Sequence, residues 1–225
     1  MALCLAESLV ECDGFDPADQ MQRYVRWYRE GYLSSTGVCF DIGNTCRHAL
    51  HNFEDTGDPM SGSTDLGAAG NGSIMCLVLV AIGWVSEPLM AVEMAAQSSR
   101  TTHGRQEDVD GCRLLAAYLV GALSGVTKEK LLAPDGWILE ALPEALSPKI
   151  AAIAAGSESF EEGALMAVNL GDDADTTGAV FGQIGGAFYG VEGIPQGWFE
   201  KMAMRERIEE LATQLIQTKG ASSPS

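Results

Sequence analysis

The segment from residue 171 to 190 reads GDDADTTGAVFGQIGGAFYG, and its period bears directly on the fold. Glycine recurs at every fourth position, at Gly178, Gly182, Gly186 and Gly190. This spacing places the four glycines on one stripe of a helix. Because each glycine costs about 1 kcal/mol relative to alanine in a helix, the stripe predicts close approach of a neighbouring helix backbone. The alternative, a membrane G-x-x-x-G face, is disfavoured by the short length and the aspartates at its start.

The start of this helix carries an unusual number of oxygen ligands. Asp173, Asp175 and a threonine hydroxyl form a hard donor set that suits Mg²⁺, Mn²⁺ or Ca²⁺ rather than zinc. The positive end of the helix dipole favours ionised carboxylates there. Capping is the alternative, because Asp and Thr are common N-caps. One such residue is enough for a cap, so the run favours a metal site.

Two familiar motifs overlap the same run. Asp173-x-Asp175-x-Thr177 matches the start of an EF-hand loop, but Ile184 stands at the position that needs a bidentate Glu. The EF-hand is therefore excluded. The same residues match the haloacid-dehalogenase phosphatase pattern, in which Asp173 would be the nucleophile. That pattern follows a strand, whereas the surrounding sequence predicts helices, so it remains a weaker alternative.

Apolar periodicity predicts an all-α, single-domain, compact multi-helix bundle over residues 1–216, followed by a flexible tail at 217–225. Asp16-Pro17 is a helix start, and that helix ends near Gly31. A shorter helix is expected over 44–53, and a long loop over 55–72. The remaining predicted helices are 73–84, 87–101, 107–123, 145–155, 159–170, 173–190 and 196–216.

Composition excludes several classes of protein. A net charge of −17 disfavours a nucleic-acid-binding surface. The six cysteines form no C-x-x-C pair, so a zinc ribbon is not indicated. The longest apolar run, 74–85, is 12 residues and too short to cross a bilayer. Without a signal peptide, reduced thiols and a cytoplasmic location are expected.

Two further stretches are candidates for binding. The small residues of the long loop, ending in Gly70-Asn71-Gly72-Ser73, precede a helix and can present backbone N–H groups to a phosphate. The loop contains no Lys or Arg, so it is not a P-loop, and a plain surface loop is the alternative. His103, one of three histidines, follows Thr102 at a helix end, where a structural role is the alternative to ligand contact.

These stretches, in this order, resemble the ADP-ribosylglycohydrolase family. The matching residues are Gly70-Asn71-Gly72-Ser73-Ile74-Met75, Thr102-His103, Ser159-Phe160-Glu161-Glu162, 169–176, the Gly182–Gly190 tail and Ile194-Pro195. The resemblance extends from Met1 to about residue 216, and the Asp-x-Asp-Thr element is its most specific part.

The resemblance implies an all-helical enzyme that holds two Mg²⁺ ions, or Mn²⁺ in some members, and cleaves the glycosidic bond between ADP-ribose and a protein side chain or small molecule. It implies that Asp173 and Asp175 are catalytic and bind metal together with Thr176. It also implies that Gly70, Asn71, Gly72 and Ser73 contact the phosphates or distal ribose and that His103 lines the pocket. The implied chemistry clamps the ribose hydroxyls while a carboxylate-oriented water attacks the anomeric carbon, through an oxocarbenium-like transition state.

Two departures from the family pattern affect these expectations. The family's Thr-Asp-Asp run and pocket glutamate lie upstream of the helix that here starts at Met1, and no capping residue precedes that helix. We expect that an N-terminal segment is missing, through a late-assigned start or a shortened gene, so that full activity is in question. A non-catalytic ADP-ribose-binding or structural relative is the alternative. Cys76 also stands where the family usually has an arginine.

Overall fold

The computed structural model describes residues 1–65, 70–131, 158–169 and 174–220, and every regular element in these ranges is a helix. The predicted helix over 145–155 lies outside them. The elements are α1 (Ala2–Glu11), α2 (Pro17–Glu30), α3 (Asn44–Thr56), η1 (Gly72–Cys76), α4 (Val78–Gly83), α5 (Pro88–Thr102), α6 (Gln106–Leu123), α7 (Lys128–Leu131), α9 (Phe160–Val168), α10 (Ala174–Tyr189), η3 (Val191–Gly193), α11 (Gln196–Phe199) and α12 (Arg205–Gly220).

Helix ends follow the chemistry of the residues at them. The Asp16 carboxylate accepts from the N–H groups of Ala18 and Asp19, and Pro17 occupies the first turn of α2. Gly31 ends α2 with φ of 71°. A Cβ at this position would lie 2.1 Å from the carbonyl oxygen of Gly37, so glycine is required. Ser159 caps α9 by accepting from the N–H of Glu162.

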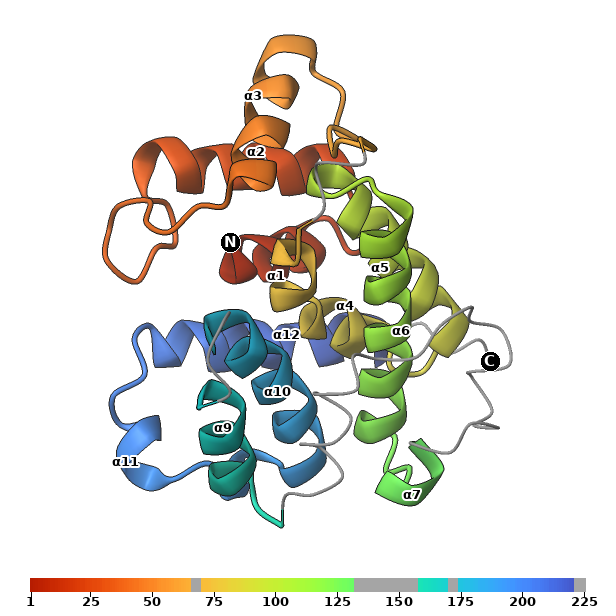
Figure 1. Ribbon diagram of the computed structural model, residues 1–225, viewed down its shortest axis with the longest axis vertical. Helices are drawn as coiled ribbons and strands as arrows, with labels where there is room; N and C mark the ends of the chain where they lie inside the picture. The colour runs from red at the N-terminus through yellow and green to blue at the C-terminus, as the bar shows by residue number, and fades with distance from the viewer. Residues whose placement is uncertain (66–69, 132–157, 170–173, 221–225) are drawn as a thin grey trace.

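The helices enclose one hydrophobic core. Figure 1 shows α1 and α4 in the middle of the molecule, α2 and α3 above them, α5 and α6 along one side, and α9 to α11 below. α5 packs along α6, α9 along α10, and α1 against both α2 and α12. The core includes Leu5, Met21, Val80, Leu119 and Leu211. The predicted all-α, single-domain class is confirmed.

A buried carboxylate ties the two ends of the described chain together. Glu7 on α1 accepts hydrogen bonds from the Tyr32 hydroxyl at 2.5 Å, from Arg207 on α12 at 2.5 Å, and from Arg23 on α2. Burial would raise the pKa of Glu7, but the hydrogen bonds from Tyr32 and Arg207 outweigh it and lower that pKa. Four side chains from distant parts of the sequence thus fix α1 between α2 and α12.

Several predicted boundaries were wrong. The helix expected over 73–84 is interrupted, with η1 and α4 on either side of Leu77. The helix expected over 196–216 is two helices, α11 and α12, and the second of them runs from Arg205 to Gly220. α3 reaches Thr56, so the loop after it begins at Gly57. No described helix is long and apolar enough to cross a membrane.

Only part of the glycine stripe of α10 is closely packed among the described residues. Added Cβ atoms at Gly182 and Gly186 would meet nothing within 4 Å among the described residues, and Gly190 lies beyond the helix with φ of 70°. At Gly178, by contrast, an added Cβ would lie 2.9 Å from Cγ1 of Val168 on α9. Other close contacts lie off the stripe. A Cβ at Gly163 on α9 would lie 2.2 Å from the Phe181 ring, and one at Gly185 would lie 2.8 Å from it. The pairing of α9 with α10 is therefore built around a buried phenylalanine.

Candidate active site

The Gly70–Ser73 turn lies directly on the side chain of His103. A Cβ at Gly70 would approach Nε2 of His103 to 2.9 Å, and one at Gly72 would approach its Cε1 to 3.1 Å. A side chain at either position would have to displace the imidazole. The structure therefore brings together two of the three stretches singled out in the sequence, and it gives a reason for the glycines: the backbone itself packs on the ring.

His103 is buried, with 1% of its surface exposed. Its Nδ1 shares a hydrogen bond of 2.9 Å with Oγ1 of Thr102, and its carbonyl oxygen accepts from the Ser99 hydroxyl at 3.0 Å. Burial lowers the pKa of His103 to about 4, so the ring is neutral near pH 7. The predicted contact with ADP-ribose remains a prediction, and the observed contact of the imidazole is with the turn.

The loop before the turn is held by a backbone crossing. The N–H of Gly62 donates to the carbonyl oxygen of Arg100 at 3.0 Å, and Ser63 forms an isolated parallel bridge with His103. A Cβ at Gly62 would lie 2.5 Å from the nitrogen of Gly104, and one at Gly104 would lie 2.3 Å from the oxygen of Gly62. Two glycines thus allow the loop to pass over the end of α5.

Ser73 connects the turn to the helices beneath it. Its hydroxyl accepts from the hydroxyl of Ser99 on α5 at 3.2 Å and lies 3.3 Å from the thiol of Cys112 on α6. The side chain is therefore engaged toward the interior. Any contact of Ser73 with a ligand would have to involve its backbone N–H or the remaining capacity of its hydroxyl.

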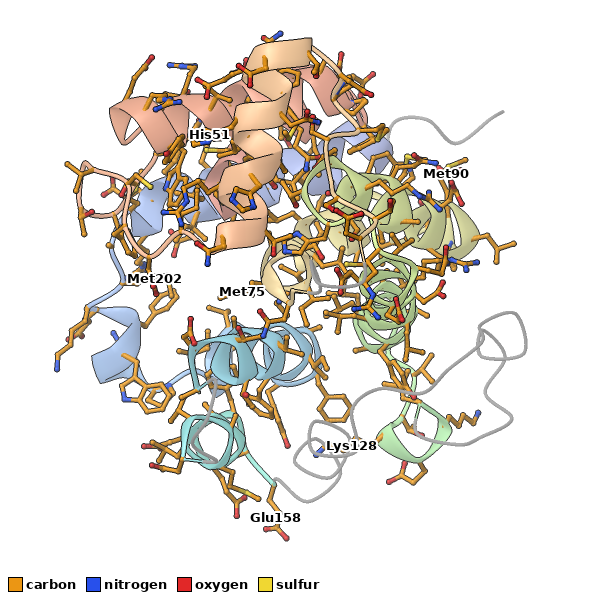
Figure 2. The ribbon with its side chains drawn as sticks, turned by 45° about the horizontal axis from the view of Figure 1, so that its top comes forward. His51, Met75, Met90, Lys128, Glu158 and Met202 are labelled. Atoms are coloured by element: carbon orange, nitrogen blue, oxygen red, sulfur yellow. The ribbon has the colours of Figure 1, made fainter. Side chains whose placement is uncertain are left out.

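The third stretch, at the start of α10, is described only in part. Asp173 lies outside the described residues. Asp175 is exposed in the first turn of α10. Thr176 is buried, and its hydroxyl donates to the sulfur of Met75 at 3.5 Å. Because Met75 is the second residue after Ser73, this contact joins α10 to the turn, and Met75, a residue of η1, is labelled in Figure 2.

The donors at the start of α10 suit Mg²⁺ in kind but are few. A carboxylate and a hydroxyl are hard oxygen ligands. The Thr176 hydroxyl donates its proton to sulfur, which leaves its oxygen lone pairs available to a cation. Among the described residues no three His, Cys, Asp or Glu side chains are grouped to hold a metal ion. Asp175 and Thr176 therefore fit part of a magnesium site, whose other ligands must come from elsewhere.

Two residues beside the turn were not predicted from the sequence. The Thr45 hydroxyl, in the first turn of α3, would lie 3.2 Å from a Cβ at Gly70. Asp108, in the first turn of α6, accepts a hydrogen bond from the N–H of Gly70. Burial raises the pKa of Asp108, while the Gly70 bond opposes that shift. Polar residues in the first turn of a helix are usually interpreted as caps. Only the tertiary structure therefore shows that Thr45 and Asp108 lie beside the turn.

Cys76 lies beside the turn. It lines a small interior space of about 10 Å³ together with Gly72 and Ser73 of the turn and with Tyr24, Cys46 and Thr102. Burial raises its pKa. The cysteine that stands at the family's usual arginine position is thus a partly buried neighbour of the turn in this chain.

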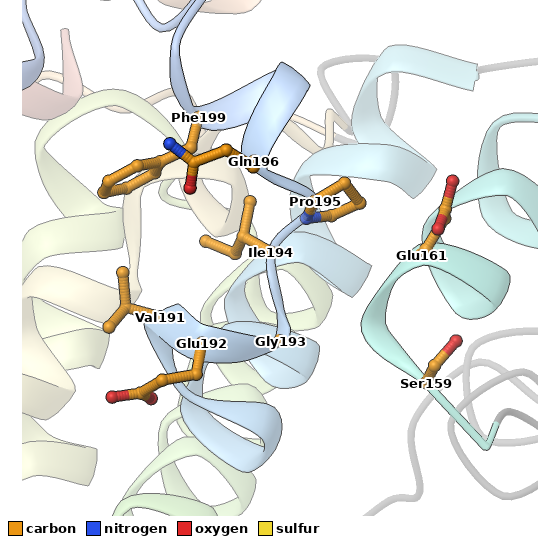
Figure 3. A pocket seen from close by; sticks show the side chains of 9 residues that line it. All are labelled: Ser159, Glu161, Val191, Glu192, Gly193, Ile194, Pro195, Gln196 and Phe199. Carbon is orange, nitrogen blue, oxygen red and sulfur yellow. The ribbon is translucent and has the colours of Figure 1, made fainter.

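A separate open pocket of about 520 Å³ lies beside the opposite end of α10. Its lining residues, drawn in Figure 3, are Ser159, Glu161, Val191, Glu192, Gly193, Ile194, Pro195, Gln196 and Phe199. Glu161 and Ser159 lie on one side, and Ile194 and Phe199 lie on the other. None of the site residues predicted from the sequence lines this pocket.

Several known proteins resemble this chain over most of its length. The ADP-ribosylglycohydrolase family model matches residues 1–135 and 127–224. The chain is 39% identical to the ADP-ribosylarginine hydrolase Tri1 of Pseudomonas putida (strain GB-1), over 96% of this chain and 64% of that protein. It is 27% identical to the ADP-ribosyl-[dinitrogen reductase] glycohydrolase of Rhodospirillum rubrum, over 93% of this chain and 74% of that protein. A solved structure titled ADP-ribosylglycohydrolase-related protein complex superposes with a TM-score of 0.78 at 38% identity, covering 97% of this chain and 79% of that one.

The chain therefore belongs to the ADP-ribosylglycohydrolase family, as its motifs indicated. It spans about 64% of the length of the Pseudomonas relative and 65% of a Serratia proteamaculans (strain 568) relative of the same name, to which it is 33% identical. The phosphatase alternative loses its basis, because the helix α9, rather than a strand, is the regular element described before α10.

Proposed function

We propose that this chain carries the larger part of an ADP-ribosyl glycohydrolase site that releases ADP-ribose from a modified protein side chain with the help of Mg²⁺. The observation that carries the proposal is the contact between Thr176 and Met75. It joins the expected metal end of α10 to the expected ADP-ribose turn across about a hundred residues of sequence. The names of the relatives favour arginine as the modified residue.

The residues have separate tasks in this proposal. The N–H groups of the Gly70–Ser73 turn bind the phosphates or distal ribose, and His103 supports the turn from below. Asp173, Asp175 and Thr176 face the ribose that carries the leaving group. Mg²⁺ or Mn²⁺, when bound, supplies positive charge that orients the ribose hydroxyls.

In the proposed reaction, water adds to the anomeric carbon as the bond from that carbon to the side-chain nitrogen breaks. Asp175 or Asp173 orients the water, takes one of its protons and passes that proton to the leaving guanidine nitrogen, which restores the carboxylate. Charge develops on the ribose ring as in other glycosyl transfers.

All six cysteines are free, which supports a reducing, cytoplasmic setting.

Release of ADP-ribose from an arginine-ADP-ribosylated protein, measured by chromatography with and without Mg²⁺, tests this function. We expect Asp175→Ala to lower the rate at least about a hundredfold, since removal of a catalytic group commonly costs that much. Glu161→Ala is the matched control, because Glu161 is also an exposed acidic residue in a first helical turn, on α9. Equal rates for the parent chain and Asp175→Ala would refute the proposal.

A second candidate function is ADP-ribose binding without turnover. It is favoured by the small number of metal donors among the described residues, where no three candidate side chains come together. Calorimetry with ADP-ribose decides between the two functions. Binding without release of ADP-ribose supports the second, and turnover by the 225-residue chain excludes it.

A further inference from the structure

Where η1 ends and α4 begins, a side chain from α10 makes the hydrogen bonds that a continuous helix would make within itself. In a continuous helix the N–H of Val78 would donate to the carbonyl oxygen of Ile74, four residues earlier. Here the amide of Gln183 stands between them. Its Oε1 accepts from the N–H of Val78 at 2.7 Å, and its Nε2 donates to the oxygen of Ile74 at 2.9 Å. The side chain thus replaces one peptide hydrogen bond with two.

The geometry requires a glutamine at this position. Gln183 is 9% exposed, and its Nε2 also donates to the carbonyl oxygen of Ala179 in its own helix at 3.2 Å. The site uses both the acceptor and the donor of the amide. Methionine has a similar length but neither function, and glutamate keeps the acceptor and loses the N–H donors. Either change leaves a backbone group in a mostly buried place without its partner.

Gln183 and Thr176 face the same neighbour. They are seven residues apart on α10, which is two helical turns, and both contact the 74–78 segment. One of the two is an expected metal ligand. The segment that they hold follows the Gly70–Ser73 turn without a break. α10 is therefore fastened to the turn at two points, of which only Thr176 can also touch a metal.

We infer that Gln183 is a positioning residue that sets the distance between the metal end of α10 and the ADP-ribose turn. This inference rests on the proposed function. If one rigid link holds both half-sites, Mg²⁺ and ADP-ribose bind more tightly together than apart, and the two effects are reciprocal. Without the link, each half-site persists but no longer has a fixed place relative to the other.

The test compares ADP-ribose affinity with and without saturating Mg²⁺ within each protein variant, by calorimetry. We expect Mg²⁺ to tighten binding about tenfold or more in the parent chain, within the usual range of coupling between sites. In Gln183→Met the ratio should fall below about threefold, and Gln183→Glu should give an intermediate ratio. Circular dichroism with and without Mg²⁺ checks that each variant is folded, because Mg²⁺ that binds the folded state would raise the folded fraction of an unstable variant.

Gln20 provides a matched control. It is 1% exposed, its Nε2 donates to Thr101 at 3.0 Å, and its Oε1 accepts from Ser98 at 3.3 Å. It therefore joins α2 to α5 through a buried amide that does not touch the 74–78 segment. We expect Gln20→Met to lower the melting temperature about as much as Gln183→Met does and to keep the parent Mg²⁺ ratio.

The possible outcomes separate the two proposals. The role of Gln183 is overturned if both Gln183 variants keep the parent ratio of ADP-ribose affinities with and without Mg²⁺. It is also overturned if Gln20→Met lowers this ratio as much as Gln183→Met does. The proposed function stands in either case. If Gln183→Met does not fold, Gln183→Glu decides by the same ratio. If the parent chain binds no ADP-ribose with or without Mg²⁺, the proposed function fails, and the role of Gln183 fails with it.

Discussion

The turn at Gly70–Ser73 and the first turn of α10 are joined through Met75, yet they are held in different ways. The first packs on a buried histidine and is hydrogen-bonded to α5 and α6 through Ser73. At the second, Asp175 is exposed, and the Thr176 hydroxyl donates to a methionine sulfur. The difference indicates that packing fixes the first turn, which is the nucleotide side of the proposed site, more firmly than it fixes the exposed carboxylate of the second, which is the metal side of the proposed site.

The largest effect on the free energy of unfolding should come from a fall in pH, which protonates His103. Its pKa is lowered from 6.5 to about 4 by burial. The unfolded chain therefore binds this proton more readily than the folded chain, and stability falls as the pH drops from about 6.5 to 4. At about 1.36 kcal/mol for each unit of pKa, the loss approaches about 3 kcal/mol. Urea unfolding across this range measures it.

His103→Gln is the matching variant for the acid effect. It removes the titrating group and should flatten the fall in stability between pH 6.5 and 4, with the carboxylates responsible for what remains below. An unchanged slope in this variant would mean that His103 is not buried as a neutral ring, and it would weaken the view that packing fixes the nucleotide side of the proposed site.

Gly62→Val should have the next largest effect. The new Cβ would meet backbone atoms of Arg100, His103 and Gly104 within 2.7 Å, and backbone cannot move aside as a side chain can. We expect a loss of about 2 kcal/mol, typical of overpacking, together with weaker ADP-ribose binding. Gly111→Ala is the control, because a Cβ there meets nothing within 4 Å among the described residues. Similar losses in both variants would contradict the special role of the crossing.

Gly182→Ala on α10 should act in the opposite direction. With open space at this position among the described residues, alanine should stabilise the protein by about 1 kcal/mol through its higher helix propensity. A higher melting temperature supports the view that the glycine stripe is not closely packed at Gly182. Destabilisation would instead revive the close helix approach that the sequence predicted.

The smallest effect on stability should come from Asp175→Ala. Because the side chain is exposed, the free energy of unfolding should change by no more than about 0.5 kcal/mol, although the same variant is expected to lose activity. Denaturant melts of Asp175→Ala beside Glu161→Ala check this. A large loss for Asp175 alone would show that the metal side is also structurally fixed without its ligand.

The sequence predicted the parts of the site that depend on local chemistry. The order of the three motifs, the donor type at the start of α10 and the cap at Asp16 all follow from residue type and spacing. The phosphatase alternative rested on the same local evidence and loses its basis, and the predicted close packing of the glycine stripe holds only in part, because a short motif does not report which elements surround it. Asp108, Thr45 and Gln183 could not have been singled out, since each is an ordinary residue in a helical pattern.

The sequence by itself thus determined an all-helical protein of the ADP-ribosylglycohydrolase family and the positions of its motifs, because periodicity, capping and short motifs are local. Only the tertiary structure decided that His103 lies buried under Gly70 and Gly72, that Phe181 fills the space left by Gly163 and Gly185, and that Gln183 interrupts a predicted helix. Each of these depends on atoms far apart in the chain. Burial and hydrogen bonding between such atoms are set by packing, which no local pattern records.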